Sequence, residues 1–184
     1  MTQGLFATLI IGTMIQQIGL LIGGSTGNVI YLLGKAAAAL TSAGIGVGVA
    51  VKYGESPLVT VSAAVAAMVG GYAGKITGGT FFVDGNAVLA GPGEPLGAFI
   101  AAFAGITCGH LVSGKTKVDI IVTPVITIGA GSVVGLLVGP PISQMMTGLG
   151  SIINWATEQR PFIMGIVVSV SYTHLRAHET SAHL

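Results

Sequence analysis

Three polar side chains that could bind a ligand lie in one short segment rich in glycine and proline. Asp84, Asn86 and Glu94 fall within residues 84–97, which read Asp-Gly-Asn-Ala-Val-Leu-Ala-Gly-Pro-Gly-Glu-Pro-Leu-Gly. Carboxylates accept hydrogen bonds and an amide both donates and accepts, so this set can hold the hydroxyl groups of a polar ligand. Glycine and proline oppose regular helix, so irregular backbone is expected here. In the alternative interpretation, Glu94 only satisfies the backbone amides of a turn.

The composition of the chain indicates that this segment belongs to a membrane protein. The sequence is 52% hydrophobic and 7% charged, and its mean hydropathy is +0.88. Soluble domains carry about 25% charged residues, which they need to cover their surface. A glycine-rich low-complexity chain is the other class with so little charge, but sustained apolar runs favour the membrane. The net charge of +1 without a basic stripe argues against nucleic acid as a partner.

The apolar runs predict an all-α, polytopic transmembrane bundle of about five to six spans. Glycine-rich turn residues at 23–28 separate the first two runs, and Pro140 and Pro141 are expected to end the fifth. Residues 142–156 are amphipathic and would lie at the interface or form a half-crossing hairpin. The runs are 5–23, 36–51, 58–74, 96–112, 120–139 and 162–170. The last of them is only the start of a span.

Residues 84–97 are predicted to form a re-entrant segment between the third and fourth spans. Irregular backbone at membrane depth survives only where it is buried in protein or lines a watery cavity. Phe81, Phe82 and Val83 precede the segment and suggest partial burial. Glycines and other small residues recur on one face of several runs, which favours close helix packing. Gln16 is expected to bond to a neighbouring helix rather than to a substrate.

Three other features have a simpler structural interpretation than a functional one. Residues 109–116 match the phosphate-binding pattern Gly-x-x-x-x-Gly-Lys-Thr, but an Ala-rich helical run precedes them where a P-loop needs a strand. We interpret them as a turn between spans, so that the competing hypothesis of nucleotide hydrolysis at Lys115 is disfavoured. Cys108 has no partner at metal-ligand spacing, and neither a metal site nor a cofactor is predicted. His110 is expected to be a hydrogen-bonded residue at a helix end.

The last residues differ from the rest of the chain. Residues 171–184 hold three of the four histidines, and nothing before them has this composition. We interpret them as a non-native or frame-shifted tail that replaces the native continuation, and we assign residues 1–170 to a partial transmembrane domain. The alternative is a histidine-rich metal-binding tail.

Three runs of sequence resemble the membrane IIC component of bacterial sugar phosphotransferase systems. They are Gly-Pro-Gly-Glu-Pro-Leu-Gly-Ala-Phe at 91–99, Leu-Val-Ser-Gly-Lys-Thr-Lys-Val-Asp-Ile-Ile-Val-Thr-Pro at 111–124, and Val-Gly-Pro-Pro-Ile-Ser at 138–143 followed by Ile-Asn-Trp-Ala-Thr-Glu at 153–158. The branch that looks most similar is the perfringolysin O regulatory protein, and the likeness extends from residue 5 to about residue 170.

The resemblance implies a multi-pass permease of the bacterial inner membrane that conducts a sugar while a partner IIB subunit phosphorylates it. Its implied partners are the sugar, the IIB and IIA components, the lipid bilayer and, at full length, a second copy in a homodimer. Such proteins continue through further helices, so this chain resembles their front portion. No phospho-accepting residue is identified, so any enzyme role is at most that of the membrane component. The alternative is a membrane sensor that binds a ligand without transporting it.

The resemblance supplies no substrate site, so the predicted site comes from the residues themselves. Sugar hydroxyls are held by fixed carboxylate and amide groups. Glu94, with Asp84 and Asn86, is the cluster of this kind at an irregular segment, and substrate sites of transporters lie at such interruptions.

Overall fold

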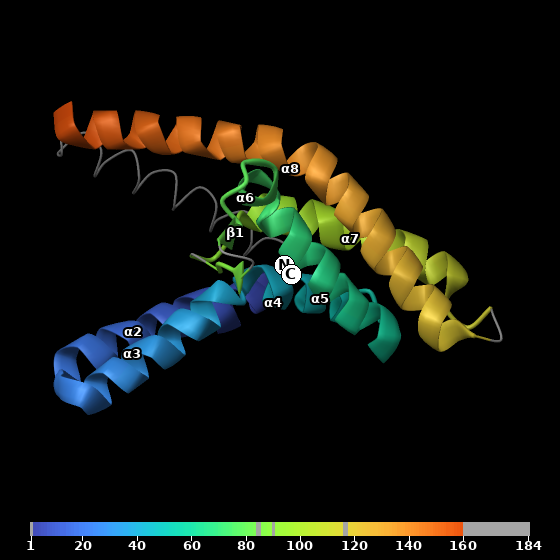
Figure 1. Ribbon diagram of the computed structural model, residues 1–184, viewed down its shortest axis with the longest axis horizontal. Coiled ribbons are helices and arrows are strands. Elements are labelled where there is room, and N and C mark those ends of the chain that lie inside the picture. The colour runs from blue at the N-terminus through green and yellow to red at the C-terminus, as the bar shows by residue number, and fades with distance from the viewer. Residues whose placement is uncertain (1, 84–85, 90, 116–117, 160–184) are drawn as a thin grey trace, which may run out of the picture. The chain divides into compact units, whose positions relative to one another are not determined.

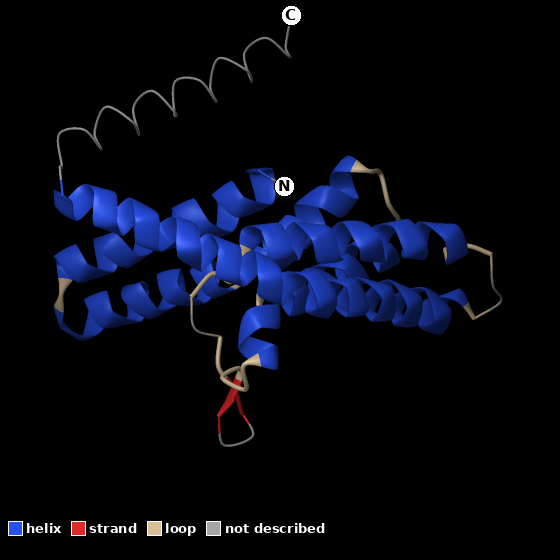
Figure 2. Cartoon of the chain, turned by 90° about the horizontal axis from the view of Figure 1, so that it is seen from above, coloured by secondary structure: helices blue, strands red, loops and turns tan. Residues whose placement is uncertain are grey.

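The computed structural model describes residues 2–83, 86–89, 91–115 and 118–159. Nearly all of them are helical, and the remainder includes one short hairpin of two strands (Figure 2). In chain order the elements are α1 Thr2–Leu5, η1 Phe6–Ile10, α2 Ile11–Ile22, α3 Gly24–Ala39, α4 Thr41–Lys52, α5 Pro57–Gly71, α6 Ala73–Thr77, β1 Phe82–Val83, β2 Asn86–Ala87, α7 Pro95–Val112 and α8 Asp119–Gln159. The sixth predicted span and the tail at 171–184 lie outside the described residues.

The contacts divide the chain into a unit of residues 1–143 and a unit of residues 144–184. The first unit contains every element from α1 to α7 and the first part of α8. In the second unit, the described residues continue α8 to Gln159. Large apolar side chains are exposed along that continuation, including Leu149, Ile152 and Trp155. The amphipathic segment predicted there is part of the one continuous helix α8.

Helices α2 and α3 form a hairpin that packs through glycine (Figure 1). The reversal is made by Gly23 and Gly24, whose φ angles of 66° and 65° are open mainly to glycine. A Cβ added at Gly19 would lie 2.5 Å from the amide nitrogen of Tyr31, so the two backbones are in contact. The Gln16 amide donates to the Gly34 carbonyl across the pair, at 3.3 Å. The predicted bond from Gln16 to a neighbouring helix is therefore confirmed.

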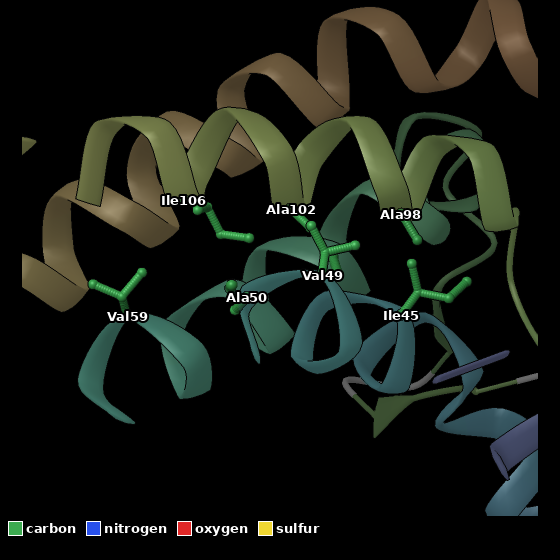
Figure 3. Close-up of a cluster of buried hydrophobic side chains, with 9 residues drawn as sticks. Ile45, Val49, Ala50, Val59, Ala98, Ala102 and Ile106 are labelled. Carbon is green, nitrogen blue, oxygen red and sulfur yellow. The ribbon is translucent and has the colours of Figure 1, made fainter. Parts of the chain in front are cut away.

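Helices α4, α5 and α7 enclose the main apolar core of the first unit (Figure 3). Branched side chains such as Ile45, Val49 and Val59 interlock there with alanines. The small residues let the helices approach closely, which is the usual basis of helix association in lipid. A Cβ added at Gly70 of α5 would lie 2.5 Å from the carbonyl oxygen of Gly97 on α7. The core also contains Ala50, Ala63, Ala67, Ala98, Ala102 and Ile106.

The described residues contain three helical segments that are long and apolar enough to cross a membrane. These are Thr2–Ile22, Pro95–Val112 and Asp119–Trp155. Helices α3 and α4, bent by 50° at Leu40, make a fourth if the pair is counted as one span, and α5 is a shorter apolar helix. The all-α transmembrane architecture is therefore confirmed, with three or four candidate spans in the described residues where about five to six were predicted for the chain. The bent pair has the form of a broken span or a re-entrant loop, and it lies at 24–52 rather than at 84–97.

Two predicted helix boundaries are wrong. Residues 24–28, expected to be turn residues, are helical in α3, because the reversal needs only the two left-handed glycines. Pro140 and Pro141 do not end the fifth span, since α8 runs through them and through Pro124. The residue before a proline normally clashes with its ring through Cβ. Gly139 removes this clash for Pro140, but not for Pro141 or Pro124, which follow residues that have a Cβ.

Candidate functional site

Two helix interruptions lie close together in the first unit. The start of helix α7 lies at the same place. The chain leaves helix at Leu40, between α3 and α4, and at Tyr72, between α5 and α6. The irregular residues 91–94 lie against both interruptions and lead directly into α7 at Pro95. Proline at the first helical position suits this start because its missing N–H would have no partner there.

Side chains at the two interruptions hold the irregular residues in place. The Ser42 hydroxyl donates to the Pro92 carbonyl at 3.1 Å. The Tyr72 hydroxyl lies 3.1 Å from the Ala39 carbonyl and also within hydrogen-bond distance of the Gly91 carbonyl. Tyr72 is only 1% exposed, and its single proton is shared between these two acceptors. This buried ring thus joins the end of α3 to the irregular segment.

Backbone contacts also hold residues 91–94 against the helix interruptions. The Glu94 amide donates to the Gly71 carbonyl at 2.7 Å, next to the α5–α6 interruption. Gly93 has a φ of 74°, and a Cβ there would lie 2.5 Å from the Ser42 hydroxyl oxygen. Glycine is therefore required at this position both by conformation and by space. Pro92, Gly93 and Glu94 are half-buried in this arrangement, while Gly91 is exposed.

A cavity of about 280 Å³ opens beside this junction, within the first unit. Its two charged residues are Lys75, in the last turn of α6, and Glu94, which precedes α7. The carboxylate of Glu94 makes no capping hydrogen bond to α7. Its acceptor oxygens therefore remain available to a ligand. The cavity is lined by Gly71, Gly74, Lys75, Pro92, Gly93, Glu94 and Ser143.

The structure separates two of the three predicted site residues, Glu94 and Asn86. Glu94 lines the cavity, whereas Asn86 lies on the exposed strand β2 opposite Val83 and is not among the lining residues. Asp84 lies outside the described residues. Phe82 and Val83 are 61% and 51% exposed, so the described part of the hairpin is less covered by protein than was expected.

Sequence reasoning missed two polar residues of the cavity, Lys75 and Ser143. The signal that could have found Lys75 is an ionisable residue next to a glycine and close to a predicted irregular segment, since such residues within membrane proteins are rare and commonly functional. Ser143 follows the proline pair by two positions, and its inclusion depends on the unexpected continuation of α8.

The residues that match the P-loop pattern form a helix end and a turn. Residues 109–112 belong to α7, and the turn at 113–115 has Gly114 at a φ of 76°. A P-loop requires a strand before it, and in the described part of the chain a helix occupies that position. The interpretation as a turn between spans is therefore confirmed for the described residues.

A second polar contact joins the other end of α7 to the turn between α4 and α5. His110 Nδ1 lies 3.0 Å from Glu55 Oε1, and the hydroxyl oxygens of Ser56 and Ser113 are 3.2 Å apart. The Glu55 side chain is 7% exposed and that of His110 is 72% exposed. Sixteen positions along a helix correspond to about 24 Å, so His110 lies far from Glu94. We interpret the pair as structural, in agreement with the expectation for His110.

Removing the imidazole should therefore destabilise the fold. We expect His110→Ala to lower the free energy of unfolding by about 1–3 kcal/mol, because a largely buried carboxylate then loses its partner. His110→Gln keeps a donor and should cost less. Unfolding of the purified protein in detergent measures both variants, and an unchanged stability of His110→Ala would show that water already satisfies Glu55.

The fold and the cavity together define a class of protein. Apolar helices carry a small cavity beside their interruptions, and substrate sites of membrane transporters commonly lie at interrupted helices. The comparison of the sequence with protein families agrees. Residues 1–177 match the model described as phosphotransferase system, EIIC. The chain belongs to this family of multi-pass membrane components, which implies in general a sugar permease role and phosphotransferase partner proteins. Neither a curated protein nor a solved structure matches the chain.

Proposed function

We propose that this chain is the permease subunit of a phosphoenolpyruvate-dependent sugar phosphotransferase system. It conducts a sugar across the bacterial inner membrane while a IIB subunit phosphorylates the sugar. The observation that carries the proposal is the position of Glu94 in a cavity formed where helices are interrupted. Family membership supports the proposed reaction, and the cavity is the proposed place for the substrate.

The chemistry of the cavity suits a sugar. A carboxylate accepts two or more hydrogen bonds from hydroxyl groups, and such charge-assisted bonds are stronger than neutral ones. Exposed backbone at interrupted helices can offer further donors and acceptors. Asp84 and Asn86 remain predictions for the same substrate, and Glu94 is the residue that the cavity favours.

Transport also requires that the site open to each side of the membrane in turn. Interrupted helices suit this because a few residues can absorb the change in backbone angles. Leu40 and Tyr72 are the interruptions beside the cavity. We infer that movement at these two positions exposes the bound sugar alternately.

Uptake of radiolabelled sugars into vesicles tests the proposal. The full-length protein is reconstituted with its IIB partner and a phosphorylated IIA donor, and the vesicles are offered a panel of hexoses and disaccharides. We expect saturable uptake of at least one sugar, recovered inside the vesicles as its phosphate. Absence of uptake across the whole panel would contradict the proposal. Binding without uptake would instead favour the sensor.

Two finer features are also proposed. We infer that the protein belongs to the branch that resembles the perfringolysin O regulatory protein. The basis for this inference is the sequence at 91–99 and 111–124. We further propose that the full-length protein is a homodimer, as the resemblance implies. Transcript levels after gene deletion test a regulatory role, and the mass of the protein in nanodiscs tests the dimer.

A further inference from the structure

The second charged residue of the cavity has no role in the proposal so far. Lys75 follows Gly74 in α6, and its ammonium nitrogen lies 5.3 Å from the centroid of the Tyr72 ring. A cation within about 6 Å of an aromatic ring is attracted to its face. Tyr72 is itself fixed by its hydroxyl between the end of α3 and residue 91. The ammonium is therefore positioned by a buried ring that also holds the segment of Glu94.

The cavity is small, and backbone forms much of its wall. Glycine supplies three of the seven lining residues, so much of the wall is backbone. A Cβ added at Gly74 would lie 2.9 Å from the hydroxyl oxygen of Ser143, which shows that α6 and α8 touch at this wall. A volume of about 280 Å³ lies just below the range of roughly 300–1,000 Å³ that is typical of ligand pockets. Such a space suits one sugar ring better than two.

We propose that Lys75 is a specificity-determining residue of the sugar site and that this site takes a single sugar ring. This inference rests on the proposed function. A sugar hydroxyl both donates and accepts, so a ring held between Glu94 and Lys75 donates to the carboxylate and accepts from the ammonium. The two residues present opposite hydrogen-bonding character to the ligand, which selects the positions of the hydroxyl groups as well as the size of the ring.

Equilibrium binding to the full-length protein in nanodiscs tests the size selection. The probes are glucose, mannose, galactose, fructose and N-acetylglucosamine, together with maltose, cellobiose and trehalose. We expect one monosaccharide to bind at least about tenfold more tightly than any disaccharide, because a second ring would lie outside the lined space and add little contact. A disaccharide that binds as tightly would overturn the inference while leaving the permease intact. If no sugar binds, the proposed function itself fails.

Lys75→Met tests the role of the ammonium, because methionine keeps an unbranched side chain without the charge. We expect affinity for the preferred sugar to fall by at least about tenfold, the usual scale for a hydrogen bond to a charged group. The matched control is Lys52→Met, at the exposed end of α4, which should bind as the wild type does. A change of less than about twofold in Lys75→Met would overturn the role of Lys75.

Monodeoxy derivatives of the preferred sugar separate recognition from a merely structural effect. In the wild type, one deoxy sugar should bind more weakly because it lacks the oxygen that accepts from Lys75. In Lys75→Met that penalty should disappear, as a double-mutant cycle requires for interacting groups. If the methionine variant does not fold, Lys75→Arg replaces it in this test, because arginine keeps a cation beside Tyr72. This variant should alter the preference among the deoxy sugars. The same preference in wild type and variants would contradict direct recognition.

Discussion

Replacing Glu94 by glutamine should abolish most sugar transport. The change keeps the size of the side chain but removes the negative charge that accepts hydrogen bonds from the substrate. A hydrogen bond to a charged group contributes about 1.5–3 kcal/mol, so we expect sugar affinity to fall by roughly 10- to 150-fold. Glu94 makes no capping bond to α7, so folding should be little affected. Binding and vesicle uptake measure the effect.

The control for this prediction is Glu94→Asp. It keeps the carboxylate but withdraws it by one methylene, so partial binding should remain. Melting temperatures in detergent establish that both variants are folded. Transport at the wild-type rate by a folded Glu94→Gln protein would show that the carboxylate has no part in recognition.

Replacing Gly131 by valine should prevent the first unit from packing. A Cβ at this position would lie 2.6 Å from the Ala66 methyl and 2.7 Å from the Ala101 carbonyl oxygen. A backbone carbonyl cannot turn away as a long side chain can, so α8 must move from α5 and α7. Overpacking of this kind costs about 1–3 kcal/mol and sometimes more. We expect loss of at least that much stability in detergent unfolding, or failure of the protein to accumulate in the membrane.

Gly129→Val is the matched control on the same helix. No atom lies within 4 Å of a Cβ added at Gly129, and the intrinsic helix preference of valine is the same at both positions. The difference between the two variants therefore isolates the contact. Equal stability of Gly129→Val and Gly131→Val would mean that α8 does not pack here.

The spans could be predicted from the sequence because their signal is local. Uninterrupted apolar runs predict the helices, and glycines recurring on one face predict close packing, as the hairpin of α2 and α3 shows. The irregular backbone before α7 was also predicted. Gly91, Pro92 and Gly93 each disfavour helix through the backbone angles of the residue itself, which is a local effect. Glu94 was selected from the same local pattern.

The interruptions and the cavity could not be predicted in this way. Leu40 and Tyr72 end helices although both residues are compatible with helix, since the interruptions depend on contacts with distant parts of the chain. The bond from Ser42 to Pro92 spans fifty positions. The partners of Glu94 in the cavity are likewise distant in sequence, which is why Lys75 and Ser143 were missed.

Protection of one cavity residue by the sugar tests the central claim most directly. A Ser143→Cys variant is made in a Cys108→Ala background, with Lys52→Cys as the exposed control, and maleimide labelling is followed in reconstituted vesicles. We predict that the transported sugar slows labelling of the cysteine at 143 severalfold and leaves the cysteine at 52 unaffected. Labelling of 143 at the same rate with and without saturating sugar, while uptake continues, would contradict a substrate site in this cavity.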